Sequence, residues 1–494
     1  MKRILALLLL ASLFCSCAAC SKSGTQEHSS GEALKTDPAE AETTIPNVDD
    51  YPIPQIPAKD YDGAIFHILG LGVGPFFPYR EFSYDENSAD VINDAVFKRN
   101  MTLKEKYNLE IMQEDTAEHS PGLLQFQQAV LAGSNEYQAA SFSLYLMMIA
   151  AQNAQLVNLA ELPYIDTSAP WYYRNIQKSL SIGGQEYLMT SYANMRIYDS
   201  SVLMYYNRNV AKELRLTGLE QTALDGKWTW DRFREYCTLY GQDLDSNGMI
   251  DERDRVGLIA HNGYILAFFV GMGGCFVEKN EENLPVYIGI NEKNEKILSQ
   301  LLTFLFTEPD SRHGESGKMT GYADQFVENR ALFTAGNVYY QRTLLGAGAD
   351  FGVLPYPKAD EDQTDYYVHT HYSMSAALGV PITADDLTMC GSVLSDLIYL
   401  SYAYIYPAHV EKTMQYRYAA DEAATKVLQM TFDSLTVELS TALNLRCDTT
   451  LRQLGARRMT QFVSSFEAIK SVSEETVRKY AENFSGNERT ADDA

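Results

Sequence analysis

Residues 64–74, with the sequence AIFHILGLGVG, decide the fold class of this chain. The run from Ala64 to Leu71 is apolar and indicates a buried strand, and the glycines that follow indicate a turn after it. The segments beyond this turn alternate between helix and strand patterns, with a helix over 90–107, a strand over 109–113, a helix over 121–133, a strand over 137–144 and a helix over 146–156. Because such alternation builds parallel sheets, the sequence predicts an α/β lobe.

The remaining chain is too long for one ordinary core, so we expect a second lobe. Strand and helix patterns alternate again over 201–306, with a helix expected over 230–240, which predicts that this lobe is also α/β. The later patterns indicate a helix over 322–333, strands over 351–354 and 366–378, and a largely helical C-terminal part over 389–484. No apolar run after the first twenty residues reaches the length of a transmembrane helix.

The first twenty residues have the pattern of an export signal. A basic start at Lys2 and Arg3 precedes an apolar run, 4–14, that is too short to span a bilayer. Two alanines stand before Cys20, as in a bacterial lipobox, so we predict lipidation at Cys20, with Cys17 as the alternative. The chain is therefore expected to lie outside the cytoplasm, anchored to the cell membrane by acyl chains.

Two polar segments flank the predicted lobes. Residues 21–60 are rich in Ser, Glu, Thr, Ala and Pro and show no apolar period, which predicts a disordered stalk between the anchor and the body. Residues 485–494 form a polar tail.

Charge and motifs exclude several classes of protein. The formal net charge of −25 would repel phosphate backbones, so nucleic acid is not expected as a partner. The sequence contains no nucleophile elbow, zinc-protease helix, P-loop or cysteine nucleophile signature. We expect no enzyme and no catalytic cofactor, while a glycan hydrolase with an Asp/Glu pair and a ligand-free adhesive lipoprotein stay open as alternatives.

Several spaced motifs resemble extracellular solute-binding proteins of carbohydrate ABC transporters. They lie over roughly 62–440 and comprise NDAVFKRN at 93–100, KYNLEI at 106–111, WTWD at 228–231, DLDSNG at 243–248, ENRALF at 328–333 and FGVLPYPK at 351–358. The order of these motifs, together with the lipoprotein-like start, makes the resemblance more specific than any one of them.

This resemblance implies a two-lobed periplasmic-binding-protein-like (type II) fold with strands that cross between the lobes. The first lobe would comprise 61–200 and about 335–385, and the second would comprise 201–334 and about 386–484. One crossover is expected at 201–207 and another between Ala331 and Asp350. The implied function is capture of a carbohydrate, or another small polar solute, by lobe closure and delivery to ABC transporter permease subunits.

One acidic segment has the spacing of a calcium loop. Oxygen ligands are expected at positions 1, 3, 5, 9 and 12, a backbone carbonyl at position 7 and glycine at position 6, in the order Asp243, Asp245, Asn247, Gly248, Met249, Asp251 and Asp254. Position 12 is aspartate, whose shorter side chain reaches less far than glutamate. The segment predicts a structural Ca²⁺ site, with a solvated acidic turn as the alternative.

Aromatic residues are the candidate ligand contacts, because flat rings stack on sugar C–H faces and their polar tips bind hydroxyl groups. Ordinary core packing is the alternative for each ring. Gly72 is a candidate for lining the cleft with backbone. The candidates are Gly72, Trp171, Tyr172, Tyr339, Tyr340, His371 and Tyr372.

Overall fold

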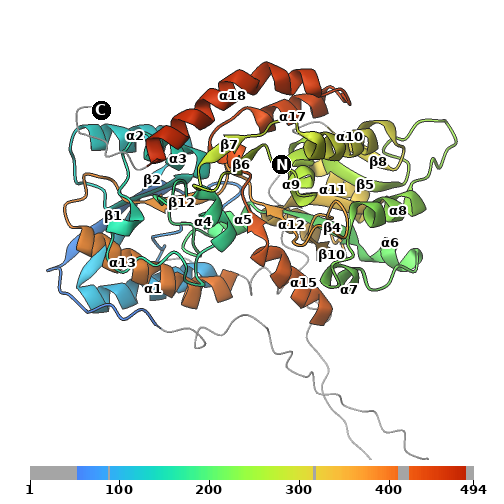
Figure 1. The fold of residues 1–494 in the computed structure, drawn as a ribbon. Helices are drawn as coiled ribbons and strands as arrows, with labels where there is room; N and C mark the ends of the chain where they lie inside the picture. The colour runs from blue at the N-terminus through green and yellow to red at the C-terminus, as the bar shows by residue number, and fades with distance from the viewer. Residues whose placement is uncertain (1–52, 87–88, 315–318, 410–421, 486–494) are drawn as a thin grey trace, which may run out of the picture. The chain divides into compact units, whose positions relative to one another are not determined.

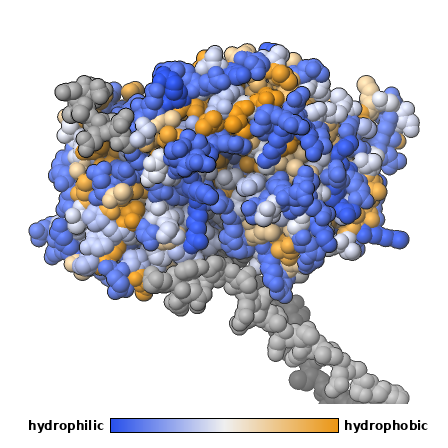
Figure 2. All heavy atoms as spheres, in the orientation of Figure 1, coloured by the Kyte–Doolittle hydropathy of each residue, from blue (hydrophilic) through white to orange (hydrophobic). Residues whose placement is uncertain are grey.

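The computed structural model describes residues 53–86, 89–314, 319–409 and 422–485, which all belong to one compact unit. The predicted signal segment with Cys20, most of the predicted stalk and the tail lie outside the described residues. Among the helices described, none combines the length and the apolar character needed to cross a membrane. Hydrophilic residues cover most of the face drawn in Figure 2, in keeping with the strong negative charge.

The first sheet has the strand order β12-β3-β1-β2 (Figure 1). Its strands are β1 (Ala64–Leu71), β2 (Leu109–Thr116), β3 (Ala139–Ser143) and β12 (Ala376–Gly379). The strands β2 and β3 run parallel to β1, and β12 joins β3 antiparallel. The side chain of Asp90 caps α1 (Val91–Tyr107) by accepting from the backbone N–H groups of Ile92 and Asn93. The predicted strand–helix–strand unit is thereby confirmed.

The second sheet has the strand order β10-β4-β9-β5-β8. Its strands are β4 (Val202–Asn207), β5 (Val256–His261), β8 (Ser311–Gly314), β9 (Ala331–Asn337) and β10 (Phe351–Leu354). The strands β8 and β9 flank β5 in parallel, whereas β4 pairs antiparallel with β9 and β10. The sequence-predicted helix over 230–240 is α8 (Trp230–Tyr240), which the hydroxyl of Thr229 caps.

Helices cover both sheets, and two small sheets complete the fold. The strands β6 (Val277–Lys279) and β7 (Pro285–Tyr287) pair, as do β11 (Val368–His369) and β13 (Leu435–Thr436). The C-terminal helix α18 (Val463–Phe484) contacts β7 and α3 (Leu144–Gln152) (Figure 1). The remaining helices are α2 (His119–Leu131), α3 (Leu144–Gln152), η2 (Leu159–Glu161), α4 (Arg174–Leu180), α5 (Met195–Asp199), α6 (Arg208–Glu213), α7 (Leu219–Leu224), η3 (Asn262–Tyr264), α9 (Ile265–Gly271), α10 (Glu292–Thr307), α11 (Met319–Val327), η4 (Val338–Tyr340), α12 (Gln341–Gly346), α13 (Leu387–Leu400), η5 (Ser401–Ile405), α15 (Glu422–Asp433), α16 (Leu439–Ala442), α17 (Cys447–Ala456) and α18 (Val463–Phe484).

The predicted helix over 322–333 is wrong in its second half. The helix α11 ends at Val327, and Asn329 has a positive φ of 59°. The backbone N–H of Arg330 donates to the carbonyl of Gln325, which closes the helix as a left-handed C-cap does. Because the chain leaves the helix at this cap, the apolar residues that follow form the buried strand β9.

Two chain segments connect the sheets. The first runs from Asn194, whose side-chain amide donates to the Ser141 hydroxyl in β3 of the first sheet, into β4 of the second sheet. The second runs from β10 through 370–375 into β12, and the backbone N–H of His371 donates to the Ser200 carbonyl of the first segment. The predicted crossover between Ala331 and Asp350 is wrong, because β9 and β10 both belong to the second sheet.

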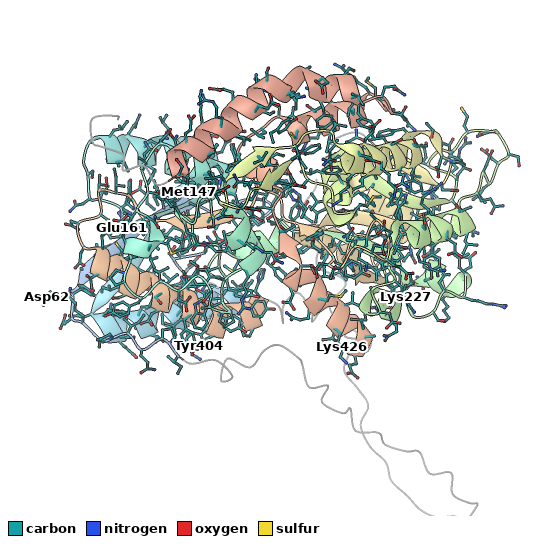
Figure 3. The ribbon with its side chains drawn as sticks, viewed as in Figure 1. Asp62, Met147, Glu161, Lys227, Tyr404 and Lys426 are labelled. Atoms are coloured by element: carbon teal, nitrogen blue, oxygen red, sulfur yellow. The ribbon has the colours of Figure 1, made fainter. Side chains whose placement is uncertain are left out.

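The predicted lobe limits need three changes. Residues 335–354, assigned to the first lobe, contribute strands to the second sheet, since their apolar runs pair with β4. Helix α13, assigned to the second lobe, packs on α1. In η5, which follows α13, the ring of Tyr404 (labelled in Figure 3) has its centroid 4.1 Å from Lys98 Nζ of α1. The end of the predicted stalk belongs to the body, because Ile56 is buried in the core and Asp60 accepts from Asn108.

Candidate ligand-binding site

Ligands of open α/β sheets bind beyond the carboxyl ends of the strands. In this chain the parallel strands β1, β3 and β5 end at Leu71, Ser143 and His261. The polar and aromatic side chains nearest to these ends come from four parts of the chain. Tyr145 and the Phe76–Phe77 pair follow β3 and β1, His371 and Tyr372 lie on the connecting segment 370–375, Asp448 and Arg452 lie on α17, and Tyr339 lies in η4 after β9. They form two groups, which we call the polar cluster (Tyr145, His371, Tyr372, Asp448 and Arg452) and the aromatic patch (Phe76, Phe77 and Tyr339).

Hydrogen bonds connect four members of the polar cluster. The Tyr372 hydroxyl donates to Asp448 Oδ2 at 3.1 Å, and Arg452 Nε donates to the same oxygen at 2.8 Å. Arg452 Nη2 lies 3.2 Å from Nε2 of His371. The Tyr145 ring meets the Tyr372 ring edge-on, with centroids 5.7 Å apart.

Burial sets the charge state of the polar cluster. It lowers the pKa of His371 to about 3, and the charge of Arg452 acts in the same direction. The imidazole is therefore neutral near pH 7, and because a guanidinium only donates, Nε2 accepts from Arg452. That leaves the proton on Nδ1, which lies 3.1 Å from the Ser373 hydroxyl. Burial also raises the pKa of Asp448, although Arg452 opposes this shift.

The aromatic patch lies beside the turn after β1. The Phe76 and Tyr339 rings have centroids 5.1 Å apart, and Phe77 meets Tyr339 edge-on at 6.0 Å. The carbonyl of Gly72 accepts from Arg196 at 2.9 Å, and the Arg196 guanidinium lies 4.8 Å from the Phe77 centroid. Since Phe76 is half exposed, the patch offers an open apolar ring to a ligand.

The structure separates the sequence-predicted aromatic residues into three positions. His371 and Tyr372 lie in the polar cluster, and Tyr339 meets the turn that contains Gly72. Trp171, Tyr172 and Tyr340 are buried instead. The Trp171 ring packs on Tyr399 at 5.2 Å, and Tyr340 fills the space beside Gly336, where a Cβ atom would lie 2.3 Å from its ring.

Sequence reasoning did not identify Tyr145, Asp448 and Arg452 as members of the site. Each lies in an unremarkable helix pattern, and only the fold brings them to Tyr372. The Phe76–Phe77 pair, by contrast, directly follows the glycine turn and could have been found as an apolar pair in a polar loop.

The predicted calcium loop brings three of its carboxylates together. Single oxygens of Asp243, Asp245 and Asp254 lie within 4.8 Å of one another. Asp254 is buried and accepts from the backbone N–H groups of Leu244 and Asp251, while the Asp243 Oδ2 accepts from Gly248 at 2.8 Å, which lowers the pKa of Asp243.

The other predicted ligands of the loop differ in their surroundings. Asp251 forms an ion pair with Arg253 at 2.7 Å, and Arg253 also reaches Asp245 at 3.2 Å. The Asn247 side chain accepts from the backbone N–H of Met249, whose own side chain is exposed. Arg253 thus supplies positive charge beside Asp245 and Asp251, as a bound cation would.

Comparison with protein-family models and with curated proteins finds no match to this chain. Many solved structures match its fold. A cyclo/maltodextrin-binding protein complexed with maltotetraose is 11% identical, with a TM-score of 0.52 over 87% of this chain and 100% of the other. UgpB from Mycobacterium tuberculosis in complex with glycerophosphocholine is 14% identical, with a TM-score of 0.55 over 84% and 99%. A sugar transporter from Rhizobium etli in an open conformation is 10% identical, with a TM-score of 0.53 over 86% and 100%. The chain therefore has the two-lobed α/β fold of periplasmic binding proteins.

Proposed function

We propose that this protein captures a small polar solute, foremost a carbohydrate, between its two α/β lobes and delivers it to an ABC transporter permease. The polar cluster carries this proposal, because it places hydrogen-bonding groups of low net charge beyond the strand ends of a fold that solute-binding proteins share. The function is binding and transfer, without covalent chemistry.

The chemistry of the two groups favours a hydroxyl-rich ligand. Tyr145 and Tyr372 present ring faces, and neutral His371 with Arg452 presents a polar edge. Ring faces bind sugar C–H groups while the polar edge binds hydroxyls. Two of the similar structures are complexes, one with maltotetraose and one with glycerophosphocholine, so glycerol phosphodiesters belong in the same test.

A ligand screen tests the proposal. Thermal shifts of the purified protein would be measured against mono- and oligosaccharides and glycerophosphodiesters, and calorimetry would follow on any hit. We expect a hit whose affinity falls in Tyr145→Ala but not in Tyr164→Ala, an exposed tyrosine outside both groups. Intact ligand should be recovered. Recovery of cleaved glycan would indicate a hydrolase instead, and an absence of any hit would contradict the carbohydrate assignment.

Export and lipidation at Cys20 form the second part of the proposal. The support is the leader pattern at 1–20 and the preceding alanines. Mass spectrometry of the N-terminal peptide from membranes should show an acylated Cys20, and Cys20→Ser should release the protein from the membrane. Acylation at Cys17 would correct the position, and an unmodified, uncleaved N-terminus would contradict the anchor.

We also propose structural Ca²⁺ in the loop 243–254. The support is the three converging carboxylates and a buried Asp243 Oδ1 that has no hydrogen-bond partner among the described residues. Ca²⁺ should raise the melting temperature of the wild type and of Asp362→Asn, an exposed control, but not that of Asp243→Asn. An equal shift in all three proteins, or no shift in any, would leave the loop an acidic turn braced by Arg253.

A further inference from the structure

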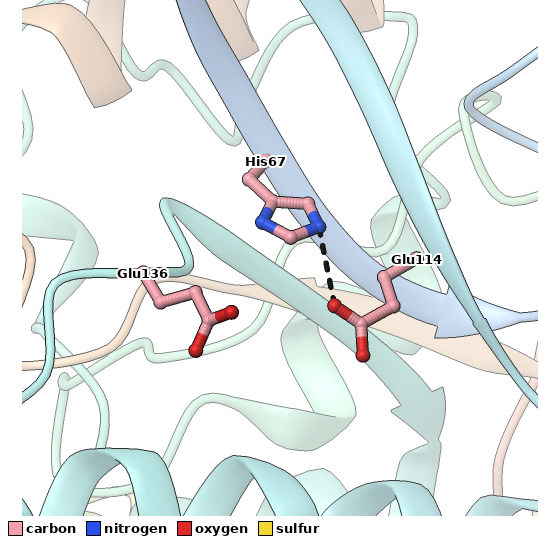
Figure 4. A group of neighbouring side chains, drawn as sticks. All are labelled: His67, Glu114 and Glu136. Atoms are coloured by element: carbon pink, nitrogen blue, oxygen red, sulfur yellow. Dashed lines mark ion pairs between the residues drawn. The ribbon is translucent and has the colours of Figure 1, made fainter.

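A second group of possible metal ligands lies on the first sheet, away from the calcium loop. It comprises His67 on β1, Glu114 on β2 and Glu136 just before β3 (Figure 4). His67 is opposite Met112 in the parallel register, and side chains two residues apart share a face, so His67 and Glu114 project from the same face. We call these three residues the histidine–glutamate cluster.

The three side chains converge on one point. One ring nitrogen of His67 and one carboxylate oxygen from each glutamate lie within 4.8 Å of one another. His67 Nε2 is 3.4 Å from Glu114 Oε2, and Figure 4 shows both carboxylates beneath the imidazole. Glu136 is exposed, so its side chain can move inward without displacing the core.

The His67 imidazole lacks the partner that its burial requires. The residue is only 8% exposed, and its Nε2 has no hydrogen-bond partner among the described residues. The 3.4 Å approach to Glu114 is an ion-pair contact without hydrogen-bond geometry. Buried polar atoms without a hydrogen-bond partner are rare in folded proteins, so this nitrogen marks a place where a ligand can bind.

Hydrogen bonds hold the Glu114 carboxylate in place, but no cation among the described residues pairs with Glu114 or Glu136. Gln125 Nε2 donates to Glu114 Oε1 at 2.5 Å and the Tyr137 hydroxyl lies 3.3 Å from Oε2, which fixes this carboxylate beside His67. Within the described parts of the chain, no lysine or arginine comes within ion-pair distance of Glu114 or Glu136. Two negative charges therefore face one imidazole without a fixed cation.

We infer that the histidine–glutamate cluster binds a divalent transition-metal ion of the zinc class. An imidazole nitrogen with two carboxylate oxygens is a donor set for such ions, whereas Ca²⁺ and Mg²⁺ prefer oxygen alone. Ligand bonds of about 2.0–2.2 Å require the three donors to draw closer, which the exposed Glu136 permits. Water would complete the coordination, and the bound ion would connect β1, β2 and the segment before β3.

Zinc titration of the purified full-length protein, stripped with chelator, tests this inference. Calorimetry should show one zinc site in the wild type that is weakened in Glu136→Gln. Loss of outer partners of metal ligands costs about 10- to 100-fold in affinity, and loss of a direct ligand should cost at least as much. Co²⁺ bound to the same site should give visible absorption bands that Glu136→Gln removes.

Matched variants make the result specific. Glu161→Gln removes an exposed glutamate elsewhere and should leave zinc binding unchanged. Asp243→Asn should also leave it unchanged, which separates this site from the calcium loop. Equal zinc affinity in wild type and Glu136→Gln would overturn the inference, as would a wild type that binds no zinc, in which case His67 and Glu114 only contact each other. His67→Asn adds a check, but Glu136→Gln decides because its side chain lies on the surface.

Discussion

The core beside the second sheet and the segments that connect the two sheets are stabilised by different interactions. In the core, Trp230 is 1% exposed and packs its ring on Phe233 and Phe304, with centroids 5.5 and 5.3 Å away. We call the two connecting segments, 194–201 and 370–375, the crossing. In the first of them, Arg196 Nε lies 3.6 Å from Glu81 Oε2, and both residues are buried. Packing of apolar rings therefore stabilises the core, whereas a buried ion pair connects residues at the crossing.

The buried charges act as a network. Arg99 is fully buried and donates to the carbonyl of Glu81 and to Ser401, while the backbone N–H of Arg196 donates to Glu81 Oε1. Burial raises the pKa of Glu81, and the charge of Arg196 opposes this shift. Burial lowers the pKa of Arg99 to about 9, and the charge of Glu81 opposes that shift. Such groups fix a geometry more than they add stability, because their desolvation offsets most of their attraction.

The largest expected loss of stability follows from deleting the Trp230 ring. Trp230→Ala leaves a cavity among aromatic rings and should lower the free energy of unfolding by about 3–5 kcal/mol. Urea denaturation measures the change. Tyr164→Ala, which removes an exposed ring, should change stability far less. Equal losses in the two variants would show that the aromatic core is not closely packed.

Breaking the buried ion pair should cost nearly as much. Glu81→Gln leaves the Arg196 and Arg99 charges without their carboxylate, and we expect a loss of about 3 kcal/mol in the free energy of unfolding. The double variant Glu81→Gln/Arg196→Met should recover part of this loss, because the unpaired charge of Arg196 is then removed.

An exposed ion pair provides the matched control for Glu81. Glu475 on α18 pairs with Arg478 at 2.7 Å, and both side chains are about half exposed. Exposed pairs contribute little because water screens them, so Glu475→Gln should leave urea denaturation unchanged within error. If Glu475→Gln and Glu81→Gln have the same effect, burial is not what makes the crossing pair important.

The contrast between the core and the crossing also holds for prediction: the sequence predicts elements of the core better than the contacts made at the crossing. The sequence predicts helix α8 with the limits that the structure has, because Thr229 caps it and its apolar residues repeat with a helix period. The sequence prediction extends the helix to 333, into the first residues of strand β9, since the apolar run follows Asn329 without glycine or proline to mark the break. Local signals of cap and period thus determine the elements and the fold class.

The candidate site depends on contacts that no local pattern encodes. The sequence predicts His371 and Tyr372 as a pair of adjacent rings. Asp448 and Arg452 join them only because α17 packs beside the connecting segment 370–375. Trp171, although a natural sugar-stacking residue, is buried against Tyr399. Residue type suggests chemistry, whereas burial decides whether that chemistry can reach a ligand.

The pH dependence of stability should separate the crossing from the core. An unfolded histidine has a pKa of about 6.5, while that of His371 in the fold is about 3. Between these values the unfolded chain takes up a proton that the folded chain refuses, so stability falls as the pH drops, by up to about 1.4 kcal/mol per pH unit.

Replacing His371 tests this dependence directly. The variant His371→Gln should show a shallower fall of stability between pH 6 and 4 than the wild type, measured by urea denaturation at each pH. Buried Glu81 and Asp448, whose pKa values are raised, act in the opposite direction in both proteins, so they cancel in the comparison. Identical slopes would mean that His371 is protonated in the fold.

The smallest expected effect concerns ligand affinity, and it tests whether the crossing serves binding as well as stability. Tyr372→Phe keeps the ring beside Tyr145 but removes the hydroxyl that donates to Asp448. A hydrogen bond contributes about 1 kcal/mol. If the Tyr372 hydroxyl supports the bound ligand by one such bond, its loss should raise the Kd for the ligand found in the screen about fivefold. Calorimetry measures the change, with Tyr164→Phe as the control. A Kd that stays constant in Tyr372→Phe but rises in Tyr145→Ala would assign ligand contact to the ring faces alone, and the hydroxyl of Tyr372 would then serve only to hold the crossing segment against α17.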